Sequence, residues 1–455
     1  MGLDLSAPGA LAVHVVGVGG TGMSAIAEVL ATMGHRVSGS DLRASPVLDR
    51  LRGLGVHVAV GHDAANVPAD VDLVTASTAV GSSNPEVAEA RRRGVPVLAR
   101  ADVLAAVTRL RRTVAVAGTH GKTTTSAMVA TVLDAAGFDP SYVVGGQITG
   151  RGSGARWSEG EWLVVEADES DGTFLDLAVD VALVTSVEPD HIEHYGTFDA
   201  QIEAFGRFLA GAAGTRLVCA DDPVAAALGA DEGALTYGFD PGADLRIAGY
   251  EGGRTGSRFA LVRAGVALGD VVLALPGRHN ARNAAGAAAA ALAVGAPVDQ
   301  VLGGLAAFAG VGRRSQVRGE RDGVTFVDDF AHLPGEVAPA LAAARDGGWS
   351  RIVCVFQPHR YSRTEALWAD FADAFVDADV LAVTELYPAG EPPRPGVSGR
   401  LVADAVRAAH PEARVEWRPD RAGLAAFLRA ELRPGDLCLT LGAGDLTTLP
   451  GELLA

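Results

Sequence analysis

The sequence predicts an α/β fold of three domains, each built on a largely parallel sheet covered by helices. Three observations favour this fold class. Short apolar, β-branched segments alternate with helical segments along the 455 residues, which is typical of parallel sheets. Glycine-rich turns join strand to helix near residues 17–22, 118–121 and 442–444. The length is about three times that of an ordinary single-core domain. We expect three domains, over residues 1–111, 112–316 and 317–455.

The first region opens with a strand over residues 12–18, a glycine turn and a helix over 23–33. Further strands are expected over 36–39, 57–60, 73–76 and 95–98. Three glycines of the turn match the dinucleotide-binding pattern: Gly17, Gly19 and Gly22. Asp41 lies about twenty residues further on, where a ribose-binding acid usually lies. Such a turn binds a diphosphate, which need not belong to NAD. A turn formed only for packing is the alternative.

The second region begins with an apolar strand over 113–117, a glycine loop and a helix over 124–136. The loop reads GTHGKT, which is shorter than the usual GxxxxGKT. Backbone N–H groups and the helix N-terminus of such a loop hold the phosphates of a nucleoside triphosphate. Lys122 would reach the β- and γ-oxygens, and the Thr123 hydroxyl would bind Mg²⁺. The expected nucleotide-binding residues are Gly118, Thr119, His120, Gly121, Lys122, Thr123 and Thr124.

Acidic residues follow the next apolar strand, expected over 163–167. Glu166 ends that strand and is the first choice for a carboxylate that holds Mg²⁺ beside the glycine loop. Asp168, Glu169 and Asp171 are weaker candidates, and a solvated acidic loop is the alternative. A third strand, over 181–187, leads to His191, which we interpret as a second metal ligand oriented by its neighbour Asp190.

Further candidates follow in the polar segments of the second half. Asn280 and Asn283 would share one helical face and bind a base or phosphate, unless one of them only caps the helix. Arg314, near the second domain boundary, is suited to stabilise a transferring phosphoryl group. Strands expected over 325–327, 351–356, 380–384 and 437–441 build the third region. Polar residues follow the first two of these strands: Asp328, Asp329 and His332, then Arg360 and Arg363, a fork suited to a carboxylate.

Composition excludes several classes of function. The net charge is −17 without a basic stripe, so we expect no nucleic-acid partner. Three widely spaced cysteines form no metal or disulfide pattern and are expected to be buried thiols. The alanine-rich stretch 284–296 is too short for a membrane span, and no signal peptide is recognisable. We therefore expect a cytoplasmic protein without a membrane partner. Residues 235–275 read as added antiparallel strands.

Together, these motifs resemble those of the Mur ligases, which add amino acids to the UDP-muramoyl precursor of peptidoglycan. The resemblance covers nearly the whole chain, in order. It rests on the segments GVGGTGMS, SGSD, GTHGKTTT, EADESDGTFL, EPDHIEHYG, GRHNARN, GRRSQ, DDFAHLP, QPHRYSRT and GAGD. The resemblance implies a Rossmann-like N-terminal domain, a central P-loop ATPase domain with a parallel sheet, and a C-terminal Rossmann-like domain.

Within that family, the motifs are most similar to those of the member that joins L-alanine to UDP-N-acetylmuramate with ATP and Mg²⁺. The resemblance implies an acyl-phosphate intermediate, with Lys122 acting on the phosphoryl charge. It assigns Thr123 and Glu166 to a first Mg²⁺ and His191 to a second. The other implied contacts are Asn283 and Asp329 for adenosine, Arg314 for the γ-phosphate, His332, Arg360 and Arg363 for the amino-acid side, and Gly19, Gly20, Gly22 and Ser24 for the UDP diphosphate. His332 is also a candidate general base.

Departures from the family pattern concern the amino-acid side. The family usually reads DDYxHHP, whereas this chain has Phe330 and Leu333 in place of the tyrosine and the second histidine. Ser315 stands where an aromatic residue commonly follows the arginine pair. One alternative is the peptidoglycan-recycling ligase, which couples a preformed peptide to the same nucleotide sugar. Another is a nucleotide-sugar-binding protein without catalysis. An NAD dehydrogenase would not explain the P-loop. The sequence leaves the oligomeric state open.

Overall fold

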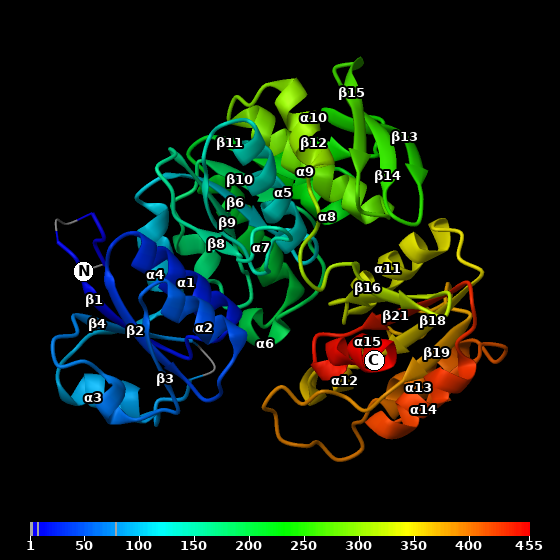
Figure 1. Cartoon of the computed structure of the whole chain (residues 1–455). Helices are drawn as coiled ribbons and strands as arrows, with labels where there is room; N and C mark the ends of the chain where they lie inside the picture. Colours follow the sequence, from blue (N-terminus) through cyan, green and yellow to red (C-terminus); the bar gives the residue numbers. More distant parts are fainter. Residues whose placement is uncertain (1–2, 7–8, 78–79) are drawn as a thin grey trace. The chain divides into compact units, whose positions relative to one another are not determined.

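The computed structural model describes residues 3–6, 9–77 and 80–455 (Figure 1). The chain divides into two compact units. The first comprises Met1–Ile247, Leu261–Gly269 and Arg282–Phe308. The second comprises Ala248–Ala260, Asp270–Ala281 and Ala309–Ala455. The three sheets, of five, ten and six strands, confirm the α/β class that the sequence predicts.

The N-terminal sheet is parallel throughout, in the order β3-β2-β1-β4-β5. Its strands are β1 Ala12–Val16, β2 Arg36–Asp41, β3 His57–Val60, β4 Leu73–Ala76 and β5 Val97–Ala99. Its helices are α1 Thr21–Thr32, α2 Pro46–Gly53, α3 Pro85–Arg92 and α4 Arg100–Thr108, with a 3₁₀ turn at Ala64–Asn66. The strand order reverses between β1 and β4, and sheets of this type bind ligands beyond the strand ends at such a point. Strand β1 stops at Val16 rather than Val18 because Gly17 turns the chain at a φ of 77°.

The central sheet has ten strands, in the order β15-β14-β13-β12-β11-β10-β6-β9-β7-β8. The strands are β6 Arg112–Ala117, β7 Ser141–Val143, β8 Ala155–Arg156, β9 Trp162–Glu166, β10 Val181–Val184, β11 Thr215–Cys219, β12 Leu235–Gly238, β13 Leu245–Gly252, β14 Ser257–Arg263 and β15 Val266–Leu273. The helices are α5 Lys122–Ala135, α6 Ile192–Tyr195, α7 Phe198–Ala210, α8 Pro223–Glu232, α9 Arg278–Ala293 and α10 Val298–Ala306, with a 3₁₀ turn at Thr173–Asp176. Strand β6 lies between β10 and β9 and is parallel to both, so the carboxyl ends of these three strands meet at one edge.

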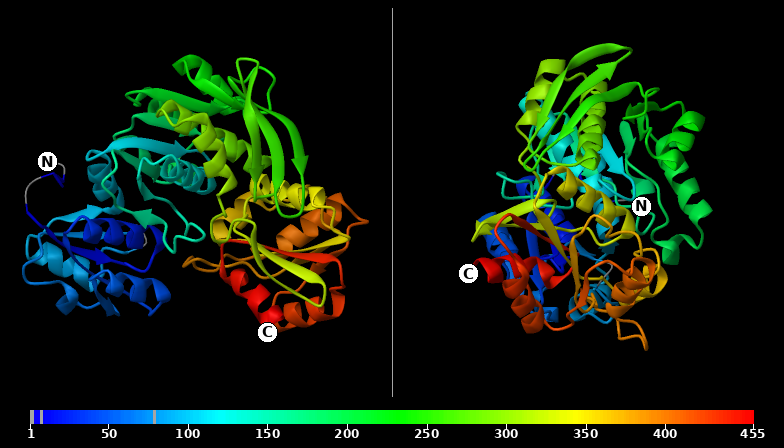
Figure 2. Two further views of the ribbon diagram at one scale, coloured as in Figure 1. Left: turned by 45° about the horizontal axis from the view of Figure 1, so that its top comes forward. Right: turned by 90° about the vertical axis from the view of Figure 1, so that its right-hand side faces the viewer.

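The added strands β13, β14 and β15 extend that sheet on one side, and Figure 2 shows them as long neighbouring arrows. Short turns join β13 to β14 and β14 to β15, which requires antiparallel neighbours as the sequence predicts. The first of them, β13, nevertheless pairs parallel with β12. The sheet is therefore mixed rather than purely parallel.

The first unit has a continuous apolar core under both of its sheets. Ile26 and Leu30 of α1 belong to the same buried cluster as Val143, Ala155 and Leu163 of the central sheet. These side chains lie at most 5 % exposed. The packing of the amphipathic helix α1 against β7–β9 thus joins the two halves of the unit through hydrophobic burial.

The sheet of the second unit has the order β16-β17-β21-β18-β19-β20. Its strands are β16 Gln316–Arg321, β17 Val324–Asp329, β18 Arg351–Phe356, β19 Val380–Val383, β20 Val415–Trp417 and β21 Asp436–Leu441. Its helices are α11 Pro334–Asp346, α12 Tyr361–Leu367, α13 Arg400–Ala409, α14 Arg421–Glu431 and α15 Leu449–Leu454, with a 3₁₀ turn at Asp445–Thr448. Only β16 runs antiparallel to its neighbour. The sequence gives no clear pattern for β16 and β20, because both are short or mostly polar.

The predictions on the cysteines and on the alanine-rich stretch agree with the structure. Cys219, Cys354 and Cys438 are free and buried in strands β11, β18 and β21. The alanine-rich stretch lies in α9 up to Ala293 and is buried along most of its length. Among the helices of the described ranges, none combines the length and the apolar character that a membrane span requires.

Candidate active site

The glycine loop after β6 takes a shape that only glycine permits at two positions. Gly118 and Gly121 have φ angles of 130° and 81°, in the region that side chains rarely adopt. A Cβ at Gly118 would collide with the Thr185 side chain and with the backbone of Ser186. A Cβ at Gly121 would collide with the side-chain amide of Asn283. The loop is therefore enclosed by the end of β10 on one side and by α9 on the other.

Hydrogen bonds from the segment after β10 hold this loop in place. The Thr119 and His120 amides donate to the carbonyl and the hydroxyl of Ser186, at 2.8 and 3.0 Å. The Thr119 hydroxyl exchanges hydrogen bonds with the Glu188 backbone: it accepts from the amide at 2.9 Å and donates to the carbonyl at 3.2 Å. The His120 ring lies 3.1 Å from the Glu188 carboxylate. These hydrogen bonds, all within the protein, hold the loop in its observed shape.

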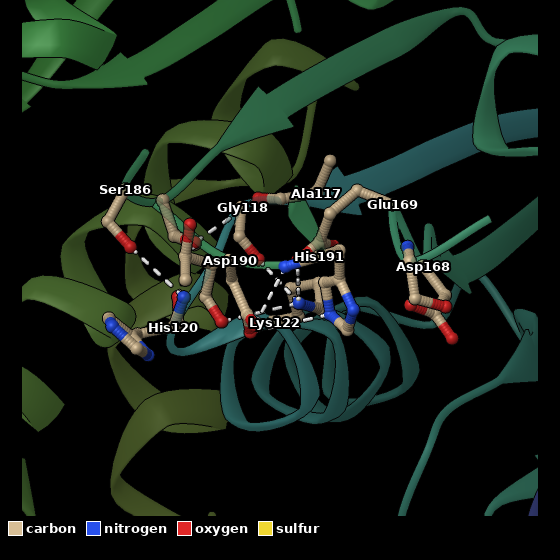
Figure 3. A network of polar contacts seen from close by, with 12 residues as sticks. Ala117, Gly118, His120, Lys122, Asp168, Glu169, Ser186, Asp190 and His191 are labelled. Atoms are coloured by element: carbon tan, nitrogen blue, oxygen red, sulfur yellow. Dashed lines mark hydrogen bonds and ion pairs between the residues drawn. The ribbon is translucent and has the colours of Figure 1, made fainter. Parts of the chain in front are cut away.

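Lys122 begins helix α5 and turns back over the loop (Figure 3). Its ammonium donates to the Gly118 carbonyl at 2.5 Å, to the Thr119 carbonyl at 3.3 Å and to Glu169 Oε1 at 2.8 Å. Burial opposes its charge, but the carboxylates of Glu169 and Asp168 outweigh that effect and raise the pKa of Lys122. The side chain is therefore cationic at the position where the loop would hold phosphate oxygens.

Glu169 is the buried partner of that lysine. The residue is 0 % exposed, and burial raises its pKa against the opposing charge of Lys122. Its second oxygen, Oε2, has no hydrogen-bond partner among the residues that the structure describes. Asp168 lies 3.7 Å from the Arg100 guanidinium, and the charges of Lys122 and Arg100 overcome the effect of burial and lower the pKa of Asp168.

Thr123 and Glu166 meet as the sequence predicts. The Thr123 hydroxyl donates to Glu166 Oε1 at 2.9 Å, and the Gly145 amide donates to Oε2 at 2.6 Å. A hydroxyl and a carboxylate at this spacing are hard oxygen donors of the kind that Mg²⁺ prefers. Within the described ranges, no group of three or more His, Cys, Asp or Glu side chains is arranged to hold a metal.

His191 follows β10 at a strained position. Its φ is 53°, left-handed for a residue with a side chain, and such strain often marks functional sites. Its ring lies 3.4 Å from Asp190, whose other oxygen accepts the His191 amide at 2.8 Å. Figure 3 draws this pair in the same polar network as Lys122 and Gly118. Buried Gln201 fixes the turn, because its side chain bonds the Asp190 amide and the Glu188 carbonyl.

The two asparagines of α9 are placed differently, although both are buried. Asn283 lies against Gly121 of the glycine loop, so its position fits a nucleotide contact. The Asn280 side-chain amide donates to the Pro276 carbonyl, four residues earlier, at 2.8 Å, so it ties the first turn of α9 to the segment before the helix.

The N-terminal glycine turn is braced by strand β2. The Gly17 and Val18 amides both donate to the Ser40 carbonyl at 2.9 Å, and the Gly19 amide donates to Asp41 Oδ2 at 2.9 Å. Asp41, expected to bind a ribose, thus supports the turn in this structure. Among the other expected residues, Gly20 caps α1, Gly22 lies against the Arg100 side chain, and buried Ser24 donates within α1 to the Thr21 carbonyl.

In the second unit, two arginines lie close to one aromatic ring. The guanidinium carbons of Arg313 and Arg314 lie 4.9 and 4.8 Å from the centre of the Phe330 ring. Arg313 also donates to the Gly442 and Gly444 carbonyls, at 2.9 and 3.2 Å. Such cation–π contacts restrict where the arginines can move.

Asp329 follows at the end of β17. It accepts the Ser315 amide at 2.7 Å and the Ala331 amide at 2.8 Å, so its carboxylate ties the arginine segment to the turn before α11.

The His359 ring lies near His332, and the charges of Arg360 and Arg363 act on it. His332 Nδ1 lies 3.0 Å from Glu336, and its ring is edge-on to His359 at 5.7 Å. Burial, followed by the charges of His332 and Arg363, lowers the pKa of His359 to about 3. Arg360 precedes α12 with a φ of 68°, and Arg363 lies within that helix. His359 is therefore neutral at pH 7, although the sequence gives no sign of this.

Three further residues of the site carry little or no signal in the sequence. Glu169 is one of four neighbouring acids, and its pairing with Lys122 follows from the turn after β9. Arg100 begins α4 of the N-terminal sheet and reaches Asp168 across the first unit. Gly145 serves Glu166 through its backbone, and a Cβ there would lie 2.7 Å from both carboxylate oxygens. Backbone donors of this kind leave no recognisable pattern in one sequence.

Comparisons with known proteins agree with this arrangement. Three profiles match the chain in order: "Mur ligase family, catalytic domain" over residues 12–112, "Mur ligase middle domain" over 116–291 and "Mur ligase, glutamate ligase domain" over 313–444. A UDP-N-acetylmuramate–L-alanine ligase from Solidesulfovibrio magneticus is 47% identical over 439 residues, 95% of each chain. One from Anaeromyxobacter dehalogenans strain 2CP-C is 48% identical over 448 residues, 97% of each chain.

Solved structures show the same fold. The UDP-N-acetylmuramate–alanine ligase of Thermotoga maritima superposes with a TM-score of 0.84 at 28% identity, over 98% of both chains. A murein peptide ligase from Psychrobacter arcticus has a TM-score of 0.71 at 22% identity, also over 98% of both chains. The ordered P-loop, the hydroxyl–carboxylate pair beside it and these full-length matches lead to one conclusion: the chain belongs to the Mur ligase family.

Proposed function

We propose that this protein joins L-alanine to the lactyl carboxylate of UDP-N-acetylmuramate at the expense of ATP, a step in peptidoglycan precursor synthesis. The observation that carries the proposal is the match to L-alanine ligases at 47 and 48% identity over at least 95% of both chains. The P-loop of the first unit, with Lys122, Thr123 and Glu166 assembled, supports an active rather than a purely binding protein.

The proposed roles follow the expected division into residues 1–111, 112–316 and 317–455, which stays a prediction. The N-terminal glycine turn would bind the UDP diphosphate, and the P-loop, with Asn283, would bind ATP. Arg314, Asp329, His332, Arg360 and Arg363 would serve the γ-phosphate, the nucleotide and the amino acid. Because ATP drives the reaction, we place it in the cytoplasm.

In the proposed reaction, an oxygen of the lactyl carboxylate attacks the γ-phosphorus, and the bond from that phosphorus to the β-bridging oxygen breaks. ADP leaves and an acyl phosphate forms. The neutral amine of L-alanine then attacks the acyl carbon, phosphate departs with the carbon–oxygen electron pair, and the nitrogen loses its extra proton. Lys122, held cationic by its carboxylate neighbours, stabilises negative charge on the phosphoryl oxygens. His332 is the candidate acceptor of the amine proton.

Magnesium fits the donor set beside the loop. Thr123 and Glu166 would hold it, with His191 proposed for a second ion. When bound, Mg²⁺ neutralises charge on the β- and γ-phosphates. Glu169 Oε2 is buried without a hydrogen-bond partner among the described residues. A cation bound beside the P-loop would compensate this oxygen, which supports the proposal of a metal there.

The first test is phosphate release from ATP in the presence of Mg²⁺ and UDP-N-acetylmuramate. The acceptors to compare are L-alanine, glycine, L-serine and the tripeptide L-Ala-γ-D-Glu-meso-diaminopimelate. Release that requires L-alanine is expected and would show that Phe330 and Leu333 are compatible with that substrate. Release only with the tripeptide would assign the protein to peptide recycling. No release with any acceptor would indicate a nucleotide-sugar-binding protein.

A further inference from the structure

A buried hydrogen bond connects the helix of the N-terminal glycine turn to the loop beside the proposed magnesium ligands. Glu28 lies in the middle of α1, and its carboxylate accepts the Ser153 hydroxyl at 2.7 Å. Glu28 is 9 % and Ser153 7 % exposed, and burial raises the pKa of Glu28. Arg50 of α2 pairs with the same carboxylate at 3.4 Å and donates to the Gly152 carbonyl at 3.2 Å. Two helices of the N-terminal sheet thus hold one short stretch of the central region.

That stretch belongs to the loop over residues 144–154, which connects β7 to β8. The loop is closed at its base, because the Val144 amide donates to the Gly154 carbonyl at 2.8 Å. A Cβ at Gly154 would lie 2.5 Å from the Gly146 carbonyl and 2.7 Å from that of Val144, so the two sides of the loop touch. Movement of Ser153 would therefore be passed to the opposite side of the loop.

The opposite side of the loop orients Glu166. The Gly145 amide donates to Oε2 of Glu166 at 2.6 Å, and the other oxygen accepts the Thr123 hydroxyl. Gly145 has no room for a side chain against this carboxylate. A continuous series of contacts therefore runs from α1, through Glu28, Ser153 and the loop, to the proposed magnesium ligand.

We propose that Glu28 and Ser153 are positioning residues for the magnesium site, acting on Glu166 through the loop 144–154 and its Gly145 amide. They touch neither nucleotide nor metal. Because α1 begins at the glycine turn assigned to the UDP diphosphate, the same bond links the nucleotide-sugar half of the first unit to its metal-binding half. The inference rests on the proposed function for the identity of the metal and of both nucleotides.

The experiment measures binding of Mn²⁺, used as a paramagnetic substitute for Mg²⁺, to the full-length protein with ADP. Electron paramagnetic resonance reports the free Mn²⁺. Ser153→Ala is expected to weaken nucleotide-dependent Mn²⁺ binding about tenfold, the range seen when groups that orient metal ligands are removed. Ser153→Thr, which keeps the hydroxyl, should restore it. Gly145→Ala, which displaces Glu166 directly, should weaken it at least as much.

Controls separate positioning from general destabilisation. Thr32→Val removes a hydroxyl of the same helix that donates to the Glu28 carbonyl at 2.8 Å, and it should leave Mn²⁺ binding within twofold. Binding of UDP-N-acetylmuramate alone, measured by calorimetry, should also stay within twofold in Ser153→Ala. Glu28→Ala and Ser153→Ala should not add in the double variant, since both act through one bond.

Two outcomes would overturn the inference. Mn²⁺ affinity within twofold of wild type in both Ser153→Ala and Glu28→Ala would show that the bond does not orient Glu166. If Ser153→Ala does not fold, Glu28→Gln is compared with Glu28→Ala, because the glutamine keeps an acceptor for the Ser153 hydroxyl. Equal Mn²⁺ affinity in these two variants would also show that the bond does not orient Glu166. Absence of nucleotide-dependent Mn²⁺ binding in the wild type would instead refute the metal site itself, and the inference with it.

Discussion

The Lys122 ammonium lies 2.8 Å from Oε1 of Glu169, and this ion pair joins the P-loop to the turn after β9 inside the first unit. Both side chains are largely withdrawn from solvent, with 15 % and 1 % exposure. Their opposite charges compensate each other. An incoming triphosphate would compete with Glu169 for the same ammonium.

The ion pair predicts that removing the Lys122 charge alone destabilises the protein more than removing both charges. Lys122→Met leaves a buried carboxylate without its counter-charge, and it should lower the free energy of unfolding by about 3 kcal/mol. The double variant Lys122→Met/Glu169→Gln should recover a large part of that loss, because no uncompensated charge remains. Guanidinium unfolding of the wild type, Lys122→Met and the double variant checks this. A double variant less stable than Lys122→Met would show that Glu169 contributes mainly through other contacts.

Lys122 should matter more for chemistry than for substrate binding. Removing a cation that stabilises developing phosphoryl charge costs about 10²–10³ in kcat. We expect Lys122→Met to lose at least that factor in phosphate release, while the Kd for UDP-N-acetylmuramate stays within twofold. A kcat that falls less than tenfold would contradict the assigned role.

Thr123 and Glu166 should control the requirement for magnesium. Thr123→Val and Glu166→Gln each remove an oxygen donor of the pair, so the Mg²⁺ concentration at half-maximal activity should rise about tenfold or more. Thr131→Val is the matched control, because its hydroxyl donates to the Ala127 carbonyl within α5, on the same helix as Thr123. An unchanged Mg²⁺ dependence in both site variants would place the metal elsewhere.

Glu86 should make stability depend on pH in the acid range. Although burial alone would raise its pKa, hydrogen bonds from His14, Ser40 and Asn66 lower it from 4.5 to about 2. Since the pKa is lower in the folded state, its contribution is present above pH 4.5 and is lost as the pH falls toward 2. This contribution is about 3 kcal/mol at most.

Urea unfolding at several pH values checks that prediction. The difference in unfolding free energy between wild type and Glu86→Gln should narrow as the pH falls from 4.5 toward 2. Glu412→Gln, at an exposed carboxylate, is the control and should show little difference at any pH. If the difference in unfolding free energy between wild type and Glu86→Gln does not change with pH, the network stabilises the protein through its packing and not through the Glu86 charge.

Phe330 should act on Arg314 through its ring. Phe330→Leu removes the aromatic face beneath both arginines, and loss of cation–π attraction predicts a fall of about tenfold in kcat. Phe330→Tyr keeps the ring and should retain most of the activity with L-alanine. Steady-state phosphate release measures both variants. Equal losses in the two variants would show that keeping the ring does not preserve activity, and would contradict a role for the cation–π contacts.

Much of the fold could be predicted because β-branched runs and glycine turns have strong local causes. Strands β3, β4 and β18 begin and end where the sequence predicts. Helix α5 begins two residues early, at Lys122, because Gly121 caps it in a left-handed conformation. Strands β16 and β20 could not be predicted, since pairing with neighbours distant in sequence, rather than local propensity, forms them.

The site was predictable where chemistry requires a particular side chain at a strand end. Thr123 and Glu166 come together because β6 and β9 are adjacent and parallel. The contact of Asn280 with Pro276 and that of Asp41 with Gly19 could not be distinguished from ligand contacts in the sequence, because the same polar side chains serve both purposes. Arg100 and Gly145 depend on tertiary placement alone.

The buried cluster that α1 shares with β7–β9 has a practical consequence for dissecting the chain. A fragment that ended at residue 111 would leave the apolar side of α1, including Ile26 and Leu30, without its cover. Exposed apolar area of this kind promotes aggregation. Expression trials should therefore keep the first two sequence regions on one polypeptide. If spectroscopy requires a shorter, isotope-labelled fragment, the exposed apolar side of α1 would first have to be redesigned.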